Sequence, residues 1–156
     1  MAINEHSYQI TVSWTGNRGT GTSGYRDYGR EHEVTAAGLP TLLGSADPTF
    51  HGDRGRWNPE QLLLTALAQC HMLSYLHVAV KNGITVISYR DTADGTMVLN
   101  PDGSGQFTSA TLRPQLVITD GAKLELATAL HQEASQKCFI ARSVNFPVRH
   151  EPGVTA

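Results

Sequence analysis

The sequence predicts an α+β fold in one domain that spans residues 1–156. Two observations lead to this prediction. Segments rich in β-branched and aromatic residues are mixed with two helical segments, and they do not alternate as regular βαβ units. A chain of 156 residues has the usual size of one domain, and it contains no internal repeat or low-complexity tract. The expected order is two strands, a long loop, a helix, a β-hairpin, a second helix and a final strand.

The N-terminal third is expected to form two strands and two loops. Residues 7–14 are β-branched and aromatic, and they run into the turn residues 15–17. Residues 19–29 hold four glycines and few apolar side chains, so we expect a loop that leads to a strand at residues 31–36. Gly, Pro, Asp and Ser are frequent in residues 37–57, which predicts a long irregular connection. Loops of that length are uncommon unless they are functional.

A long apolar helix is predicted over residues 59–81. Asn58 is a suitable N-cap, Pro59 fits the first helical position, and Glu60 favours the positive end of the helix. Apolar residues fall on nearly every face, which is typical of a buried helix. Four polar residues interrupt the helix and argue against a membrane span: Gln69, His71, Ser74 and His77.

The middle of the chain predicts a long β-hairpin. Residues 84–99 and 106–119 are rich in strand-forming residues. Between them, residues 100–105 read Asn-Pro-Asp-Gly-Ser-Gly, which is typical turn chemistry.

The C-terminal part predicts a helix and one more strand. Residues 122–137 carry apolar side chains at helical spacing with polar residues between them, which indicates an amphipathic helix. Cys138 falls at or just past its end. We expect a last strand at about residues 144–149, followed by a tail that frays at Pro152 and Gly153.

Charge and composition exclude several classes of function. The net charge is −2, and the 12 basic residues are spread along the chain, so no nucleic-acid partner is expected. The segment Met1–His6 lacks the features of a signal peptide, and no run predicts a membrane span, so we expect a cytoplasmic protein without a membrane partner. In that reducing compartment two cysteines are more often catalytic, redox-active or metal-binding than a structural disulfide.

The two cysteines are the first candidates for chemistry. Cys70 lies inside the apolar helix, where a free cysteine is by default an inert small hydrophobic residue. Cys138 lies between Lys137 and Arg142, and nearby cations favour a thiolate. The spacing is not Cys-x-x-Cys, so a thioredoxin-like site is not indicated.

Glu60 precedes Cys70 by ten positions, about 15 Å along an ideal helix, which excludes direct contact within that helix. An arginine from another segment or another subunit could bind both groups and stabilise a thiolate, with Glu60 holding its guanidinium. Each candidate is otherwise a solvated surface charge, and the candidates are Arg18, Arg26, Arg30, Arg54 and Arg56.

No metal site or nucleotide site is predicted, and no cofactor is expected. His71 and His77 are six positions apart, which places them about 120° apart around the helix, a poor arrangement for one metal ion. Hydrogen bonding in the core or lining of a pocket fits these histidines better. Residues 19–24 match Gly-x-Gly-x-x-Gly by letter, but no helix follows them, so the dinucleotide interpretation fails.

Two segments resemble the OsmC/Ohr superfamily. Residues 58–73, which read NPEQLLLTALAQCHML, resemble the first-cysteine helix, including the interval from Glu60 to Cys70. Residues 137–148, which read KCFIARSVNFPV, resemble the second-cysteine segment. The predicted hairpin also falls where the family has one, so the resemblance covers most of the chain.

The resemblance implies a fold in which strands wrap around a buried central helix, in an intertwined homodimer with active sites at the subunit interface. It implies a peroxidase for organic hydroperoxides that also accepts hydrogen peroxide in some members. Cys70 would be oxidised to a sulfenate, and Cys138 would condense with it to a disulfide. A dithiol, such as that of a lipoyl-bearing protein, would reduce this disulfide.

The resemblance also implies an arginine that Glu60 anchors. In the Ohr branch this arginine follows the first strand in a glycine-rich turn, and Arg18 occupies that place here. In the OsmC branch it lies upstream of the helix, where residues 48–52 contain no arginine and Arg54 or Arg56 would substitute. The alternative function is that of a non-catalytic, stress-induced protein that binds a hydrophobic ligand at the dimer interface.

Overall fold

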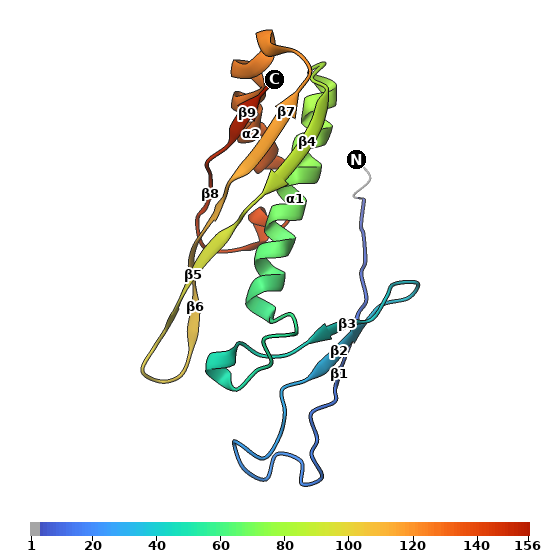
Figure 1. Cartoon of the computed structure of the whole chain (residues 1–156), viewed down its shortest axis with the longest axis vertical. Helices are drawn as coiled ribbons and strands as arrows, with labels where there is room; N and C mark the ends of the chain where they lie inside the picture. Colours follow the sequence, from blue (N-terminus) through green and yellow to red (C-terminus); the bar gives the residue numbers. More distant parts are fainter. Residues whose placement is uncertain (1–3) are drawn as a thin grey trace. The chain divides into compact units, whose positions relative to one another are not determined.

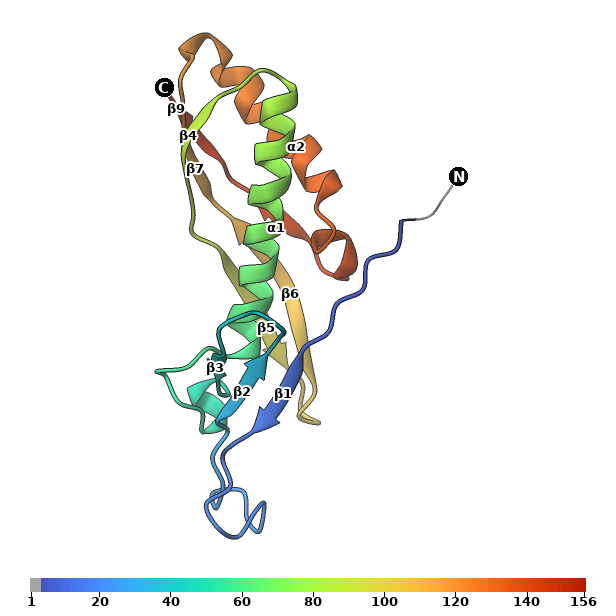
Figure 2. The same ribbon diagram turned by 90° about the vertical axis from the view of Figure 1, so that its right-hand side faces the viewer.

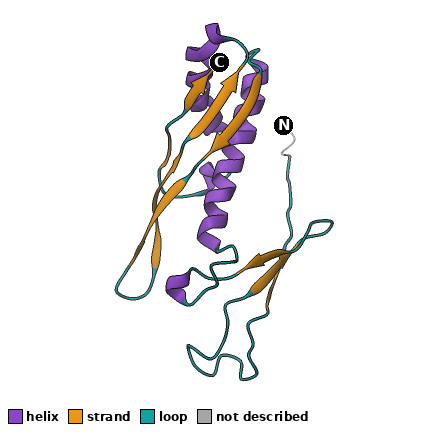
Figure 3. Ribbon diagram, in the orientation of Figure 1, coloured by secondary structure: helices purple, strands orange, loops and turns teal. Residues whose placement is uncertain are grey.

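The computed structural model describes residues 4–156, so the first three residues of the segment Met1–His6 lie outside it. Strands and helices are mixed along the chain, and the predicted α+β class is confirmed (Figures 1 and 3). The chain divides into two compact units, with the division after Leu62, inside the long helix. The assignment of all residues to one domain stays a prediction.

The N-terminal unit contains one antiparallel sheet in the order β1-β2-β3. Its strands are β1 (Thr11–Trp14), β2 (His32–Thr35) and β3 (Leu42–Gly44), followed by a short 3-10 helix, η1 (Pro48–Phe50). The first two strands were predicted, whereas β3 lies in the segment that the sequence predicts to be irregular. A three-residue strand is too short to show alternation, and its pairing with β2, such as His32 with Gly44, decides its conformation.

Helix α1 (Pro59–Lys81) has the predicted bounds. Asn58 Oδ1 accepts a hydrogen bond from the Gln61 N–H at 2.8 Å, and the Asn58 N–H donates to Gln61 Oε1 at 3.3 Å. This reciprocal pair is a capping box, and it explains why the helix begins where it does. The prediction of burial on all sides is wrong for the single chain, because Leu73 and Val80 are 62% and 75% exposed.

The buried residues of α1 form one stripe, at the spacing of a single helix face: Leu67, His71, Tyr75, Val78 and Ala79. By length and composition alone α1 is apolar enough to span a membrane. The core helix of a soluble protein passes the same test. One such helix is weak evidence of a membrane span, and the buried stripe of α1 packs in the core of the C-terminal unit.

The C-terminal unit contains the predicted hairpin, which is split into two pairs of strands. Strand β4 (Val86–Asp91) pairs with β7 (Pro114–Ile118), and β5 (Asp94–Leu99) pairs with β6 (Gly105–Leu112). The split falls at Arg113, whose N–H donates to Asp91 Oδ1 at 2.7 Å. At Arg113 the backbone N–H therefore bonds a side chain instead of a neighbouring strand.

Helix α2 (Leu124–Lys137) follows a 3-10 turn, η2 (Gly121–Lys123), close to the predicted bounds. A second 3-10 turn, η3 (Ala141–Ser143), leads to β8 (Val148–His150), which pairs with β6 in parallel. The expected fraying of the tail is wrong, because β9 (Gly153–Thr155) pairs in parallel with β7. This pairing uses backbone groups, so it could not be predicted from the side chains around Pro152.

The main core lies between the two helices and the sheet β4-β7-β9. Figure 2 shows α1 and α2 on the same side of that sheet. The core comprises Tyr75, Val78 and Ala79 of α1, Ile84, Leu116 and Ile118 at the sheet, and Ala127, Leu130 and Ala134 of α2. A second cluster joins Leu67 of α1 to Ala110 and Leu112 of β6. Packing of α2 on α1 brings the end of α2, with Cys138, toward the middle of α1.

Candidate active site

The two cysteines meet in the C-terminal unit. Cys70 lies in the middle of α1 and is half-buried, whereas Cys138 ends α2 and is 1% exposed. The Cys70 side chain contributes to the raised pKa of the Cys138 thiol, which places the two side chains close together, and both cysteines are free. Two sulfur atoms that are far apart in the sequence therefore lie within reach of each other.

Cys138 carries its proton at neutral pH. Burial raises the pKa of its thiol to about 11, and the neighbouring Cys70 side chain contributes in the same direction. The Ala141 N–H donates to Cys138 Sγ at 3.4 Å, which lowers the pKa by a smaller amount. The expectation that Lys137 favours a thiolate here is wrong, because Lys137 pairs with Glu133 and burial dominates.

Glu60 faces a cavity of about 330 Å³ within the N-terminal unit. The aromatic side chains of the wall are Trp14, Tyr28, His32 and Phe50. Glu60 Oε2 is buried and has no hydrogen-bond partner within the described part of the chain. A buried carboxylate oxygen without a partner is costly, so this atom is available to a cationic group.

Arg30 lines the same cavity and is held in place by its own loop. Its guanidinium donates to the carbonyl oxygens of Tyr28 at 2.6 Å and Tyr25 at 2.7 Å. The guanidinium carbon also lies 4.1 Å from the centre of the Tyr28 ring and 4.8 Å from that of Tyr25. These contacts restrict the rotamers of Arg30, so its charge is held in one position.

Close backbone contact between Gly16 and Gly29 holds together the two ends of the loop that precedes Arg30. The Gly29 N–H donates to the Gly16 carbonyl oxygen at 2.8 Å, and Trp14 Nε1 donates to the Gly29 carbonyl oxygen at 2.8 Å. A Cβ on Gly16 would overlap that Gly29 oxygen, so the closure requires glycine at position 16. The loop that the sequence identifies by its glycines therefore serves to place Arg30.

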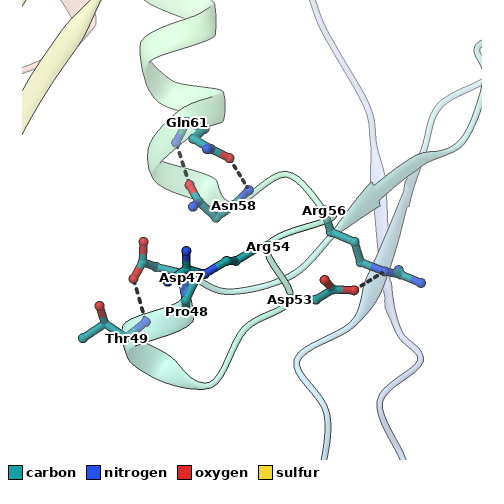
Figure 4. A pocket seen from close by; sticks show the side chains of 8 residues that line it. All are labelled: Asp47, Pro48, Thr49, Asp53, Arg54, Arg56, Asn58 and Gln61. Atoms are coloured by element: carbon teal, nitrogen blue, oxygen red, sulfur yellow. Dashed lines mark hydrogen bonds and ion pairs between the residues drawn. The ribbon is translucent and has the colours of Figure 1, made fainter.

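The other candidate arginines lie elsewhere. Arg18 and Arg26 are exposed and line neither this cavity nor the second one. The second cavity, of about 420 Å³, is polar (Figure 4). Arg54 and Arg56 line it, and Arg56 Nε lies 3.9 Å from Asp53. Of the five candidates, Arg30 is the arginine that shares a cavity with Glu60.

The histidines separate into buried and exposed ones. His77 is exposed, whereas His71 is fully buried and its Nε2 lies 2.9 Å from His131 Nδ1. His131 and His150 were not candidates from the sequence, although His131 falls on the same face of α2 as the buried Ala127 and Ala134. Among residues 4–156, no three His, Cys, Asp or Glu side chains are placed to hold a metal ion.

The family model for OsmC-like protein matches residues 51–152, which is more than half of the chain. The chain belongs to this family. The match includes both cysteines and Glu60, and it confirms the resemblance found in the sequence. A search of curated proteins found no match.

Solved structures of OsmC-like proteins share the fold of this OsmC-like chain. One from Vibrio cholerae, of unknown function, is 31% identical over 95% of this chain and 99% of its own, with a TM-score of 0.82. An organic hydroperoxide resistance protein OsmC from Legionella pneumophila is 19% identical, with coverages of 99% and 100% and a TM-score of 0.70. An organic hydroperoxide resistance protein from Elizabethkingia anophelis is 15% identical, with coverages of 97% and 99% and a TM-score of 0.66. The OsmC/Ohr fold is thereby confirmed.

Proposed function

We propose that this OsmC-like chain is a thiol-dependent peroxidase that reduces organic hydroperoxides, with Cys70 as the attacking thiolate and Cys138 as the resolving thiol. The observation that carries the proposal is the close approach of the two cysteine side chains, through which Cys70 contributes to the raised pKa of the Cys138 thiol. Burial raises the pKa of the Cys138 thiol, so Cys138 keeps its proton at neutral pH and suits the resolving role. The names of the Legionella and Elizabethkingia proteins support a hydroperoxide as the substrate class.

The proposed reaction has three steps. The Cys70 thiolate attacks the terminal oxygen of the hydroperoxide, the O–O bond breaks, and the alkoxide leaves as an alcohol after taking a proton. Cys138 then attacks the Cys70 sulfenic acid, which releases water and forms a disulfide. A cytoplasmic dithiol, for which a lipoyl-bearing protein is the candidate, reduces the disulfide through a mixed disulfide and becomes oxidised itself.

The direct test is peroxide treatment of the reduced protein followed by mass spectrometry of the intact chain and its peptides. One equivalent of cumene hydroperoxide is expected to remove two hydrogens from the chain and to link the Cys70 peptide to the Cys138 peptide. Dihydrolipoamide should then restore both thiols and sustain turnover. Peroxide consumption without a Cys70–Cys138 link would reject the resolving role, and no consumption would reject the peroxidase.

For the activating cation we propose Arg30, anchored by Glu60. The unpartnered Glu60 oxygen and the fixed Arg30 guanidinium face one cavity of the N-terminal unit, which supports this choice over Arg18. In the proposed reaction the guanidinium stabilises the thiolate and the alkoxide that leaves, because both carry negative charge.

We also propose that the working form is a homodimer. Strand β1 is an edge strand, and the alternate residues of its segment expose large apolar side chains: Tyr8, Ile10, Val12 and Trp14, between 46% and 91% exposed. Exposed apolar residues in such a row are typical of an interface between chains. A second copy of this chain is the proposed partner.

Sedimentation velocity tests the dimer. Two chains of 16.9 kDa give 33.8 kDa, and this species is expected at micromolar protein. Val12→Arg should shift the population toward the single chain, because a charge would be buried in the interface. Ser13→Arg is the matched control, since neighbouring strand residues point to opposite faces. A single-chain mass for the unmodified protein would contradict the proposal.

One observation supports the alternative function, that of a non-catalytic protein that binds a hydrophobic ligand. The cavity with Trp14, Tyr28 and Phe50 in its wall is suited to a hydrophobic ligand. In that function the thiols have no role, so a Cys70→Ser variant should bind the ligand as well as the unmodified protein does.

A further inference from the structure

A stack of buried and half-buried aromatic rings lies beside the cysteine pair, between α1, α2 and β8. The His71 ring is tilted over the His150 ring, with 4.2 Å between ring centres. The Tyr75 ring stacks on the His131 ring at 4.0 Å, and His71 Nε2 lies 2.9 Å from His131 Nδ1. His71 and His131 are 0% and 2% exposed. Neither the fold class nor the proposed peroxidase chemistry requires three histidines here.

The hydrogen bonding of this stack is incomplete in either tautomer. One hydrogen is shared between His71 Nε2 and His131 Nδ1, because each neutral ring carries one N–H and one lone pair. The outer nitrogens, His71 Nδ1 and His131 Nε2, are buried and have no partner within residues 4–156. Whichever ring donates, one outer N–H and one outer lone pair remain unsatisfied. A proton taken up from solvent would add a charge and another unpaired N–H.

The surroundings do not stabilise an imidazolium ion. The ionic or titratable groups that act on the His71 ring are the His150 and His131 rings, which would repel a charge on it. Tyr75 of α1 packs on the stack, and Tyr89 and Asp91 of β4 adjoin Tyr75. Burial raises the pKa of the Asp91 carboxyl, whose Oδ1 is already occupied by the Arg113 N–H. None of the ion pairs formed within the described part of the chain includes a ring of the stack.

The stack also joins the two elements that carry the thiols. His71 follows Cys70 on α1, and His131 lies on α2, which Cys138 ends. The Tyr75 hydroxyl donates to the Ala127 carbonyl oxygen of α2 at 2.8 Å. The histidine rings therefore lie within the contact between α2 and α1, next to the apolar core.

We propose that His71, His131 and His150 form a proton-operated latch that holds α2 on α1 at neutral pH and releases α2, with Cys138, in acid. The latch deepens the proposed function, since the thiol it releases is the proposed resolving thiol. In acid the Cys70 sulfenate would lose its partner and would become open to further oxidation.

The sign and size of the effect follow from proton linkage. Burial is the main cause that lowers the pKa of His71 to about 3 and of His131 to about 4, against 6.5 for a solvated histidine, and burial also lowers the pKa of His150. The closed state is thus fully favoured above pH 6.5, and it loses stability as the pH falls through 6.5 toward these values. From pH 7.5 to pH 5, His71 and His131 together should raise the open population roughly a thousandfold.

Hydrogen exchange tests the latch without using peroxide. The protection of the α2 amides, residues 124–137, is measured between pH 7.5 and pH 5 and corrected for the intrinsic exchange rate at each pH. The β5–β6 hairpin serves as the internal reference. Protection of α2 should fall roughly a thousandfold in the unmodified protein and only about thirtyfold in His131→Phe, which has one titrating ring fewer. His77→Phe, at an exposed position of α1, should behave like the unmodified protein.

Three outcomes would overturn the latch: α2 protection that does not change with pH, equal loss of protection in α2 and in the hairpin, or the same pH dependence in His131→Phe. If His131→Phe does not fold, the unmodified protein still gives an answer by nuclear magnetic resonance of the imidazole carbons. Proton uptake by the His131 ring without loss of α2 protection would reject the latch. A failed peroxidase assay would leave all of these results unchanged, so the two proposals fail separately.

Discussion

Replacement of Cys70 by serine is expected to lower the turnover of cumene hydroperoxide by at least roughly a thousandfold, because a serine hydroxyl is not a thiolate at neutral pH. Replacement of Cys138 by serine should have a different result. The Cys70 sulfenate still forms, so the variant consumes one equivalent of peroxide and then stops. Stopped-flow measurement of peroxide loss, with dihydrolipoamide as reductant, separates the two patterns.

The Cys138→Ser variant carries its own positive control. Dimedone should label its Cys70 after peroxide treatment, whereas the unmodified protein should give the disulfide and little label. Equal turnover in the unmodified protein and Cys70→Ser would exclude thiol chemistry at this site. If hydrophobic ligands bind with the same affinity to both proteins in that case, the non-catalytic alternative is favoured.

Replacement of Arg30 by glutamine is expected to lower kcat/KM for an organic hydroperoxide by roughly a hundredfold, the usual cost of losing one group that stabilises developing negative charge. Arg30→Lys should recover only part of this loss. A lysine keeps the charge but cannot reproduce the planar fork that binds the Tyr25 and Tyr28 carbonyl oxygens. Steady-state kinetics at several peroxide concentrations provide the measurement.

Arg18→Gln is the matched control for Arg30→Gln, since it removes the same charge from an exposed position. Its kcat/KM should stay within about twofold of the unmodified value. A large loss of kcat/KM in Arg18→Gln and none in Arg30→Gln would instead favour Arg18 as the activating cation. The pH profile of the Cys70 alkylation rate distinguishes a lost cation from a misplaced loop, because the lost cation raises the pH at which Cys70 becomes reactive.

The sequence is most informative where local chemistry decides the structure. Asn58 and Pro59 mark the start of α1 because capping uses backbone groups within one turn of the helix. The long hairpin could be predicted because residues 100–105 permit few conformations other than a turn. The family follows from residues on these predictable elements, since the Glu60 to Cys70 interval lies within one helix.

The remaining features depend on contacts that are remote in the sequence. Strands β3 and β9 are set by pairing with β2 and β7, and neither has a side-chain pattern of its own. The pKa of Cys138 is another example, because burial outweighs the charge of Lys137 that the sequence displays. His150 contacts His71 from a strand near the end of the chain, and the spacing of residues in the sequence does not predict this contact.

The position of Arg30 depends on contacts within its own loop. The glycine-rich turn favoured Arg18, whereas Arg30 is the candidate arginine that lines the same cavity as Glu60. The carbonyl oxygens of Tyr25 and Tyr28 and the two tyrosine rings hold the Arg30 guanidinium, and they do so only when the loop is folded.

The closure between Gly16 and Gly29 has a consequence for how this protein tolerates mutation. Gly16 has no functional group and belongs to neither cavity wall, yet an alanine there would push the loop apart and move the guanidinium of Arg30. Such a variant would keep every side chain of the proposed chemistry and would still react slowly. A survey of damaging substitutions would therefore highlight a residue that a list of reactive groups omits.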